Sequence, residues 1–96
     1  MAIVRVTIRT FQNLEHAELF LSIGASTKDS LKKAGLEAKF TISQSMSQPN
    51  QVVSVWEYMD EDHMNEVRKF LSVQSRLPNS LAPKEVAYET KVIYSS

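Results

Sequence analysis

Cysteine is absent from this chain of 96 residues, which excludes disulfides, thiolate nucleophiles and cysteine-ligated metals. Glycine occurs only twice, too rarely to build a glycine-rich phosphate-binding loop or a dinucleotide fingerprint. An excess of charge of one sign is also lacking, because 11 basic and 11 acidic residues cancel. Binding to nucleic acid or to a membrane surface is therefore not expected, since both need an excess of lysine and arginine.

Long hydrophobic runs are missing as well. No apolar stretch approaches the roughly 18 residues that a membrane span needs. The first residues, MAIVRVTIRTF, include Arg5 and Arg9 and lack the uninterrupted apolar core of a signal peptide. From the length and composition we expect one domain covering residues 1–96, soluble and cytoplasmic.

Four segments have the alternating apolar and polar residues, rich in β-branched side chains, that are typical of strands: 3–10, 38–46, 51–58 and 86–94. A polar turn containing Pro49 joins the second and third into a hairpin. An amphipathic helix is predicted from Leu14 to about Gly35, with Asn13 as its cap and a kink or break at 24–27.

A second helix is predicted from Asp60 to about residue 75, followed by an irregular segment, SRLPNSLAPKE, that holds two prolines. The resulting order, β-α-β-β-α-β, predicts an α+β, ferredoxin-like fold. We expect a four-stranded antiparallel sheet in the order 4-1-3-2, with both helices on one face.

Two helices cover only one face of such a sheet, so apolar side chains on the opposite face must be buried in another way. We assign the uniformly aliphatic positions of the first and third strands to the helix side: Val4, Val6, Ile8, Val53 and Val55. The opposite face would then present an aromatic and apolar patch with Val52, Trp56, Tyr58, Val86, Tyr88, Val92 and Tyr94. Hiding one such ring from water is worth about 2 kcal/mol or more. Exposed patches of this size mark interaction sites, so we expect a homodimer formed by sheet-to-sheet packing, a dimeric α+β barrel.

Arg5, Thr7 and Arg9 would lie on this partner-facing side under the same assignment. Two interpretations stay open for the arginines. They stack on the aromatic rings or reach the mouth of the barrel, or they hold an anionic ligand inside it.

The acidic run from Asp60 to Asp62, followed by His63, is the sequence feature that most suggests metal binding. Consecutive helical side chains point in different directions, so they cannot converge on one ion. We interpret Asp60 as a helix cap, with acids favoured by the helix dipole, and expect no metal site. His63 is a candidate general base if it faces a pocket.

The aromatic residues also carry two interpretations, interface core or a stacking platform for an aromatic ligand. The candidate ligand-binding residues are Trp56, Tyr58, Tyr88, Arg5 and Arg9. RNA binding, which some proteins with this element order perform, would need a basic surround that the third strand, QVVSVWEY, lacks.

The stretch NQVVSVWEYMDEDHMNEVRKFL resembles the dimeric α+β barrel superfamily, which includes antibiotic-biosynthesis-type monooxygenase domains. Relatives share an aliphatic strand ending in Trp-Glu, here Trp56 and Glu57, then a short acidic cap and an amphipathic helix. The resemblance implies a homodimer. Members of the superfamily include cofactor-independent oxygenases of polycyclic phenols, haem-degrading enzymes and isomerases. The first strand, IVRVTIRT, lacks the asparagine of the haem-degrading branch. Many relatives place a histidine near the position of Asn65, and His63 lies half a turn earlier.

Two functions follow as alternatives. The first is a cofactor-independent, monooxygenase-like enzyme acting on a hydrophobic aromatic small molecule between sheet and helices. The second is a non-catalytic ligand-binding or regulatory module with the same fold. No cofactor is expected in either case.

Overall fold

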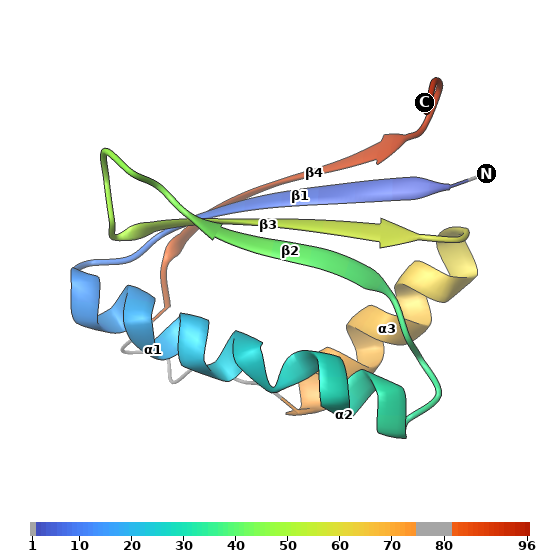
Figure 1. Cartoon of the computed structure of the whole chain (residues 1–96), viewed down its shortest axis with the longest axis horizontal. Coiled ribbons are helices and arrows are strands. Elements are labelled where there is room, and N and C mark those ends of the chain that lie inside the picture. Colours follow the sequence, from blue (N-terminus) through green and yellow to red (C-terminus); the bar gives the residue numbers. More distant parts are fainter. Residues whose placement is uncertain (1, 75–81) are drawn as a thin grey trace.

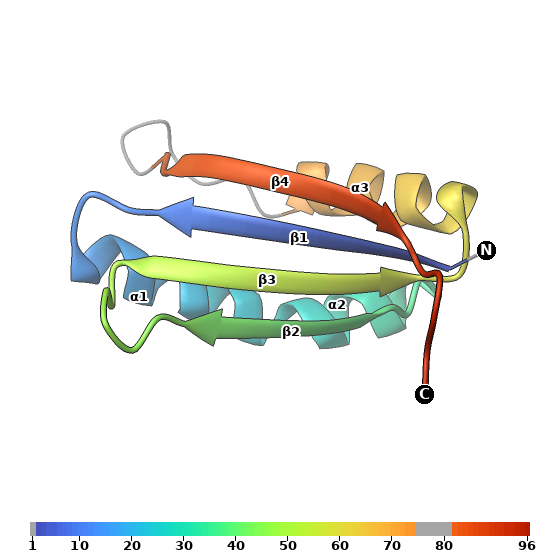
Figure 2. The ribbon, with the colours of Figure 1, turned by 90° about the horizontal axis from the view of Figure 1, so that it is seen from above.

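Four antiparallel strands form one sheet, and the helices lie against one of its two faces (Figures 1 and 2). The computed structural model of the chain describes residues 2–74 and 82–96. Its elements are β1 (Ile3–Thr10), α1 (Leu14–Ala25), α2 (Thr27–Lys33), β2 (Lys39–Gln44), β3 (Gln51–Tyr58), α3 (Glu61–Gln74) and β4 (Lys84–Lys91). The sheet order, β2-β3-β1-β4, confirms the ferredoxin-like prediction.

The first predicted helix is two helices separated at Ser26, within the range where a break is predicted. At its start the side chain of Asn13 accepts a hydrogen bond from the His16 N–H at 2.9 Å. At the break, the hydroxyls of Ser26 and Thr27 both donate to the Ile23 carbonyl, at 2.9 and 3.4 Å. Side-chain hydroxyls that occupy a helical carbonyl favour a bend, which accounts for the change of axis here.

The end of α2 and the start of α3 have sequence-encoded caps. Gly35 has φ of 70°, and its N–H and that of Leu36 bond to the carbonyls of Lys32 and Leu31. This arrangement ends α2 in the left-handed conformation that glycine adopts without strain. At the start of α3, the Asp60 carboxylate accepts from the His63 N–H at 2.8 Å, as predicted.

The last strand differs from its prediction, because it covers Lys84–Lys91 and not 86–94. It pairs with the whole of β1, from Thr10↔Lys84 to Ile3↔Lys91, so the length of β1 fixes its limits. The second strand is also shorter than predicted, at Lys39–Gln44. Of the predicted irregular segment 75–85, residues 75–81 lie outside the described residues.

The assignment of the two sheet faces from sequence is wrong for β1 and β3 but right for β4, whose Val86 and Tyr88 lie on the open face as predicted. The helix side of β1 carries Arg5, Thr7 and Arg9, whose cross-strand partners on β3 are Trp56, Ser54 and Val52. Thr7, Ser54 and Val52 are each at most 2% exposed, which places them under the helices. The aliphatic side chains of β1 and β3 lie on the open face instead, next to Val86 and Tyr88 of β4: Val4, Val6, Ile8, Val53 and Val55.

The helices need not cover the most apolar face of the sheet for the chain to have a buried core. Aromatic and aliphatic side chains on the helix side still form two buried clusters, one around Leu31, Tyr58, Met64 and Val67 and one around Phe11, Ala17 and Val52. The polar residues of β1 do not enter these clusters. They border a cavity.

Candidate functional site

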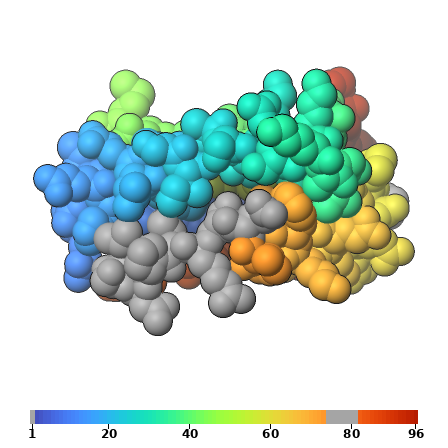
Figure 3. Space-filling view, turned by 90° about the horizontal axis from the view of Figure 1, so that it is seen from below, coloured from blue at the N-terminus to red at the C-terminus, as the bar shows by residue number. Residues whose placement is uncertain are grey.

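A cavity of about 320 Å³ lies between the sheet and the helices. Seen from the helix side, α1 and α2 lie along one half of the molecule and α3 along the other (Figure 3). The cavity is lined by all three helices and all four strands, with Pro83 just before β4. Its volume falls at the lower end of the range found for small-molecule pockets.

The part of the cavity wall formed by β1 and the middle of β3 is polar. Thr7 and Ser54 face each other across β1 and β3, and each is 2% exposed. The Arg9 Nη1 donates to the Ser54 hydroxyl oxygen at 3.1 Å. The guanidinium carbon of Arg9 lies 4.9 Å from the centre of the Phe20 ring on α1, a cation–π distance.

Arg9 is held in an environment that opposes its charge. Burial lowers its pKa from the ordinary value, and Glu85 offsets part of that effect. The Arg9 Nε is 3.6 Å from the Glu85 Oε2, beyond normal hydrogen-bond distance. Arginine nevertheless stays protonated at neutral pH, so the cavity contains a cation with an incomplete set of short polar contacts.

A second charge cluster lies further along β1. Arg5 donates to the Glu89 carboxylate at 2.5 Å, and Arg68 of α3 lies 3.5 Å from the same oxygen. One carboxylate thus serves two arginines. Together with Arg9 and Glu85, three cations face two anions, and the cavity region keeps a positive excess that favours an anionic ligand.

Trp56 and Tyr58 of β3 form an aromatic part of the cavity wall, and Phe40, which is not a lining residue, stacks on Trp56. The rings of Phe40 and Trp56 are stacked with centroids 4.4 Å apart, and Trp56 and Tyr58 follow at 6.0 Å. Burial raises the pKa of Tyr58 to about 12, an effect that Arg68 and Arg5 partly oppose. The Tyr58 hydroxyl therefore stays protonated at neutral pH, where it can donate a hydrogen bond to a ligand oxygen.

His63, the candidate general base, does not line this cavity. Its Nδ1 accepts from the Met59 N–H at 3.0 Å, which leaves the proton on Nε2, 3.0 Å from the Glu37 carbonyl oxygen. Its ring also meets the edge of Tyr58, with centroids 5.8 Å apart. Both nitrogens are engaged with backbone groups, an arrangement that ties the start of α3 to the segment before β2.

The structure thus brings together four of the five candidate ligand-binding residues, Arg5, Arg9, Trp56 and Tyr58, at one cavity. The fifth, Tyr88, is 57% exposed on the open face. The arginines do not stack on Trp56 or Tyr58 as one interpretation had it, because Arg9 lies over Phe20 and Arg5 pairs with Glu89.

Sequence reasoning missed the glutamates, although a signal for them is present. Arg5 and Arg9 are four residues apart on β1, and Glu85 and Glu89 are four apart on β4. Two antiparallel strands with these spacings place each arginine opposite a glutamate, as the pairs Arg5↔Glu89 and Arg9↔Glu85 show. The complementary charges therefore favour the register that puts these four side chains on one face of the sheet.

In the ranges 2–74 and 82–96, no three His, Asp or Glu side chains gather as a ligand set. No helix in those ranges combines the length and apolar character of a membrane span.

No protein-family model matches the sequence, and no curated protein matches it. Solved structures do match its fold. A dimeric ferredoxin-like protein from an uncultured marine organism has a TM-score of 0.79 at 16% identity, over 99% of this chain and 98% of that one. A point mutant of SnoaB, a cofactor-independent oxygenase from Streptomyces nogalater, has a TM-score of 0.71 at 12% identity, over 98% of this chain and 95% of that one.

A Bacteriodes thetaiotaomicron protein, provisionally named an antibiotic biosynthesis monooxygenase, has a TM-score of 0.72 at 11% identity, over 97% of this chain and 90% of that one. The chain has the ferredoxin-like fold of these proteins. Identities this low establish a shared fold and not a shared activity.

Proposed function

We propose that this chain is a small homodimeric, cofactor-independent oxygenase of hydrophobic aromatic molecules that carry an acidic oxygen. The observation that supports the proposal best is the position of Arg9, a partly buried cation beside a cavity with aromatic side chains and a positive excess. Structural similarity to a cofactor-independent oxygenase supports the same class of function at the level of the fold.

The cavity favours a phenol or a related enol as ligand. Trp56 and Phe20 offer ring surfaces for a fused aromatic system, and Arg9 offers a charge-assisted hydrogen bond to a phenolate oxygen. The Tyr58 hydroxyl, which burial keeps protonated, supplies a second donor. Because these groups stabilise the deprotonated ligand, they raise the fraction of the electron-rich anion that can react with dioxygen.

Oxidation then needs a proton acceptor, and Glu85 is the carboxylate that lines the cavity. With anthrone as the test substrate, the base takes a proton from the ring carbon and the resulting enolate passes two electrons to dioxygen as a C–O bond forms. The proton returns to the peroxide, which becomes a hydroperoxide. The base then takes the second proton from the same carbon, the O–O bond breaks as the second carbonyl forms, and the hydroxide leaves with that proton as water. One anthrone and one dioxygen give one anthraquinone and one water, with no cofactor consumed.

The partner in the proposed homodimer packs on the open face of the sheet. That face carries the aliphatic side chains of β1 and β3, flanked by Val86 and Tyr88, which are 50% and 57% exposed. A second copy applying the same face would cover both patches at once, as twofold symmetry requires. Structural relatives that are dimeric ferredoxin-like proteins support this arrangement.

Binding and turnover are tested separately. Trp56 is the only tryptophan of the chain, so quenching of its fluorescence by 2-naphthol reports on occupancy of the cavity. We expect Arg9→Met to weaken binding about 10- to 100-fold, the value of one charge-assisted hydrogen bond. Lys32→Met on α2, which removes the same charge from an exposed site, should leave binding unchanged.

Turnover is followed as oxygen consumption with anthrone, and Glu85→Gln should abolish it while 2-naphthol still binds. If 2-naphthol binds the wild-type chain but oxygen uptake with anthrone stays at the buffer rate, the oxygenase proposal fails. That result would favour the alternative, a non-catalytic binding module. Absence of 2-naphthol binding would exclude both functions at this cavity.

A further inference from the structure

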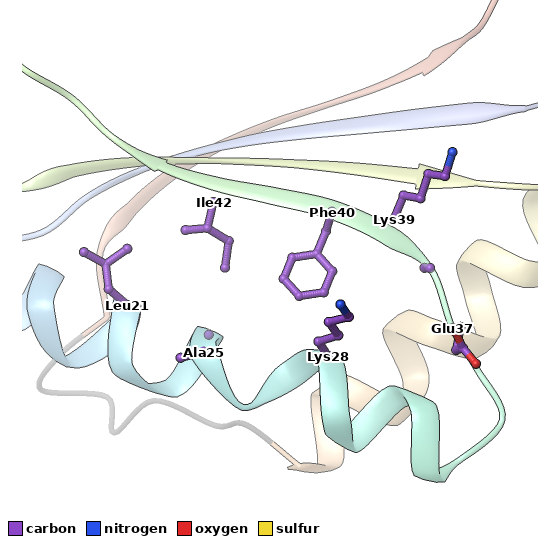
Figure 4. A pocket seen from close by; sticks show the side chains of 9 residues that line it. Leu21, Ala25, Lys28, Glu37, Lys39, Phe40 and Ile42 are labelled. Atoms are coloured by element: carbon purple, nitrogen blue, oxygen red, sulfur yellow. The ribbon is translucent and has the colours of Figure 1, made fainter.

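A second hollow adjoins the cavity on the side of the edge strand β2. This groove, of about 720 Å³, lies between β2 and the helices α1 and α2 (Figure 4). Its walls are mainly apolar, with Leu21, Ala25, Phe40 and Ile42 among them. β2 is at the edge of the sheet, so within residues 2–74 and 82–96 no further strand covers this side of it.

The groove and the cavity share two residues, Gly24 and Ile42. Gly24 is buried on the last turn of α1, and Ile42 points toward the helices from the middle of β2 (Figure 4). A Cβ atom placed on Gly24 would lie 2.7 Å from the Ile42 Cδ1, closer than real Cβ contacts come. The missing side chain of Gly24 therefore makes the space that the tip of Ile42 occupies.

The partition between the two hollows includes the flexible end of Ile42 packed against bare helix backbone. Rotation of one isoleucine side chain can open it without moving the helix or the strand. The partition also lies beside the break at Ser26, where α1 ends.

We propose that Ile42, packed against Gly24, sets the length of ligand that the cavity accepts, and that the groove is an extension subsite for an acidic tail. This inference rests on the proposed function, because the aromatic head of the same ligand occupies the cavity. The charge at the groove supports an acidic tail, since the Lys28 amine points toward the groove beside Phe40 (Figure 4). Glu37 lies at the far end of the groove, beyond Phe40, so the acid is recognised near Lys28.

Two probes with the same naphthalene ring, one without and one with an acidic tail, test the partition. The first is 2-naphthol, which occupies the cavity and does not extend into the groove. The second is 6-(naphthalen-2-yloxy)hexanoate, whose chain must pass Ile42 to reach the groove. Affinities are measured by quenching of Trp56 fluorescence. We expect Ile42→Ala to bind the hexanoate at least tenfold more tightly than the wild type does, with the affinity for 2-naphthol changed less than threefold.

Controls separate this effect from general loosening of the fold. Thr41→Ala alters the neighbouring residue of β2, whose side chain shares the open face with Val55, and should change neither affinity. Ile42→Val, a smaller truncation, should give a smaller gain in affinity for the hexanoate. It replaces Ile42→Ala if circular dichroism shows that Ile42→Ala does not fold. Adding Gly24→Ala to Ile42→Ala puts a methyl group back into the passage and should reverse the gain for the hexanoate.

The acidic tail has its own test. In the Ile42→Ala background, Lys28→Ala should lower the affinity for the hexanoate but not for the uncharged 6-(naphthalen-2-yloxy)hexan-1-ol. Equal losses for acid and alcohol would overturn the charged subsite. If the ratio of hexanoate to 2-naphthol affinities is unchanged in Ile42→Ala and Ile42→Val, the partition role is wrong while the proposed function stands. Failure of the wild type to bind 2-naphthol would overturn both.

Discussion

The proposed dimer is tested most directly by a charge at the centre of the open face. Val6 lies in the middle of β1 and pairs with Val55 on one side and Tyr88 on the other. We expect Val6→Glu to convert the homodimer to monomers. The monomer itself should keep its fold, because the new carboxylate can reach water on the uncovered sheet.

The magnitude follows from burial and charge. Full burial of a valine is worth about 1.5 kcal/mol or more, and Val6 is already half-buried by its neighbours, so each copy loses about 1 kcal/mol. Twofold symmetry doubles every effect of the substitution. Each carboxylate also loses several kcal/mol of hydration inside the interface. A total above about 5 kcal/mol raises the dimer dissociation constant by more than about 1,000-fold.

Sedimentation equilibrium at micromolar concentration measures the change. The wild type should sediment at about twice the chain mass of 10.9 kDa, and Val6→Glu at the chain mass. Val73→Glu is the matched control, since Val73 is 74% exposed on α3 and the same change there should leave the dimer intact. A Val6→Glu protein that remains dimeric, or a wild type that is monomeric, would refute sheet-to-sheet pairing.

Two further predictions concern stability. His63→Ala removes the side-chain partner of the Met59 N–H and of the Glu37 C=O, and should lower the free energy of unfolding by about 1–2 kcal/mol in urea titrations. His16→Ala on α1 should change that free energy little. Equal effects of the two substitutions would contradict a stabilising role of the His63 hydrogen bonds. The folded-state pKa of Tyr58 is raised to about 12, so the unfolded chain ionises first and stability should fall by up to about 2–3 kcal/mol between pH 10 and 12. Tyr58→Phe should lack that part of the fall, and identical alkaline profiles for the two proteins would count against a buried, protonated hydroxyl.

Much of the fold follows from sequence because local signals agree with it. The limits of β1 and β3 match their alternation, and Asn13, Gly35 and Asp60 mark helix ends by specific hydrogen bonds or backbone geometry. The end of β4 could not be found this way. Alternation continues past Lys91, whereas pairing stops with the start of β1, which is a tertiary and not a local constraint.

The inverted faces have a different cause. A rule that the most apolar face packs under the helices holds when burial within one chain is the main requirement. Here Arg5 and Arg9 lie under the helices because β4 supplies Glu89 and Glu85 in register. The cavity itself could not be predicted, since its size depends on how Phe20 and Ile42 pack across elements distant in sequence.

The location of the cavity residues also determines when the site can form. β1 pairs with β3 between Ile3↔Tyr58 and Thr10↔Gln51, and with β4 up to Ile3↔Lys91, so both pairings join distant parts of the chain. Such contacts form late, because loops must close before the contacts stabilise anything. During synthesis the cavity lacks Glu85 until β4 emerges, so a ligand can select only complete chains. Ligand added during refolding should therefore stabilise the native state without binding partly folded chains.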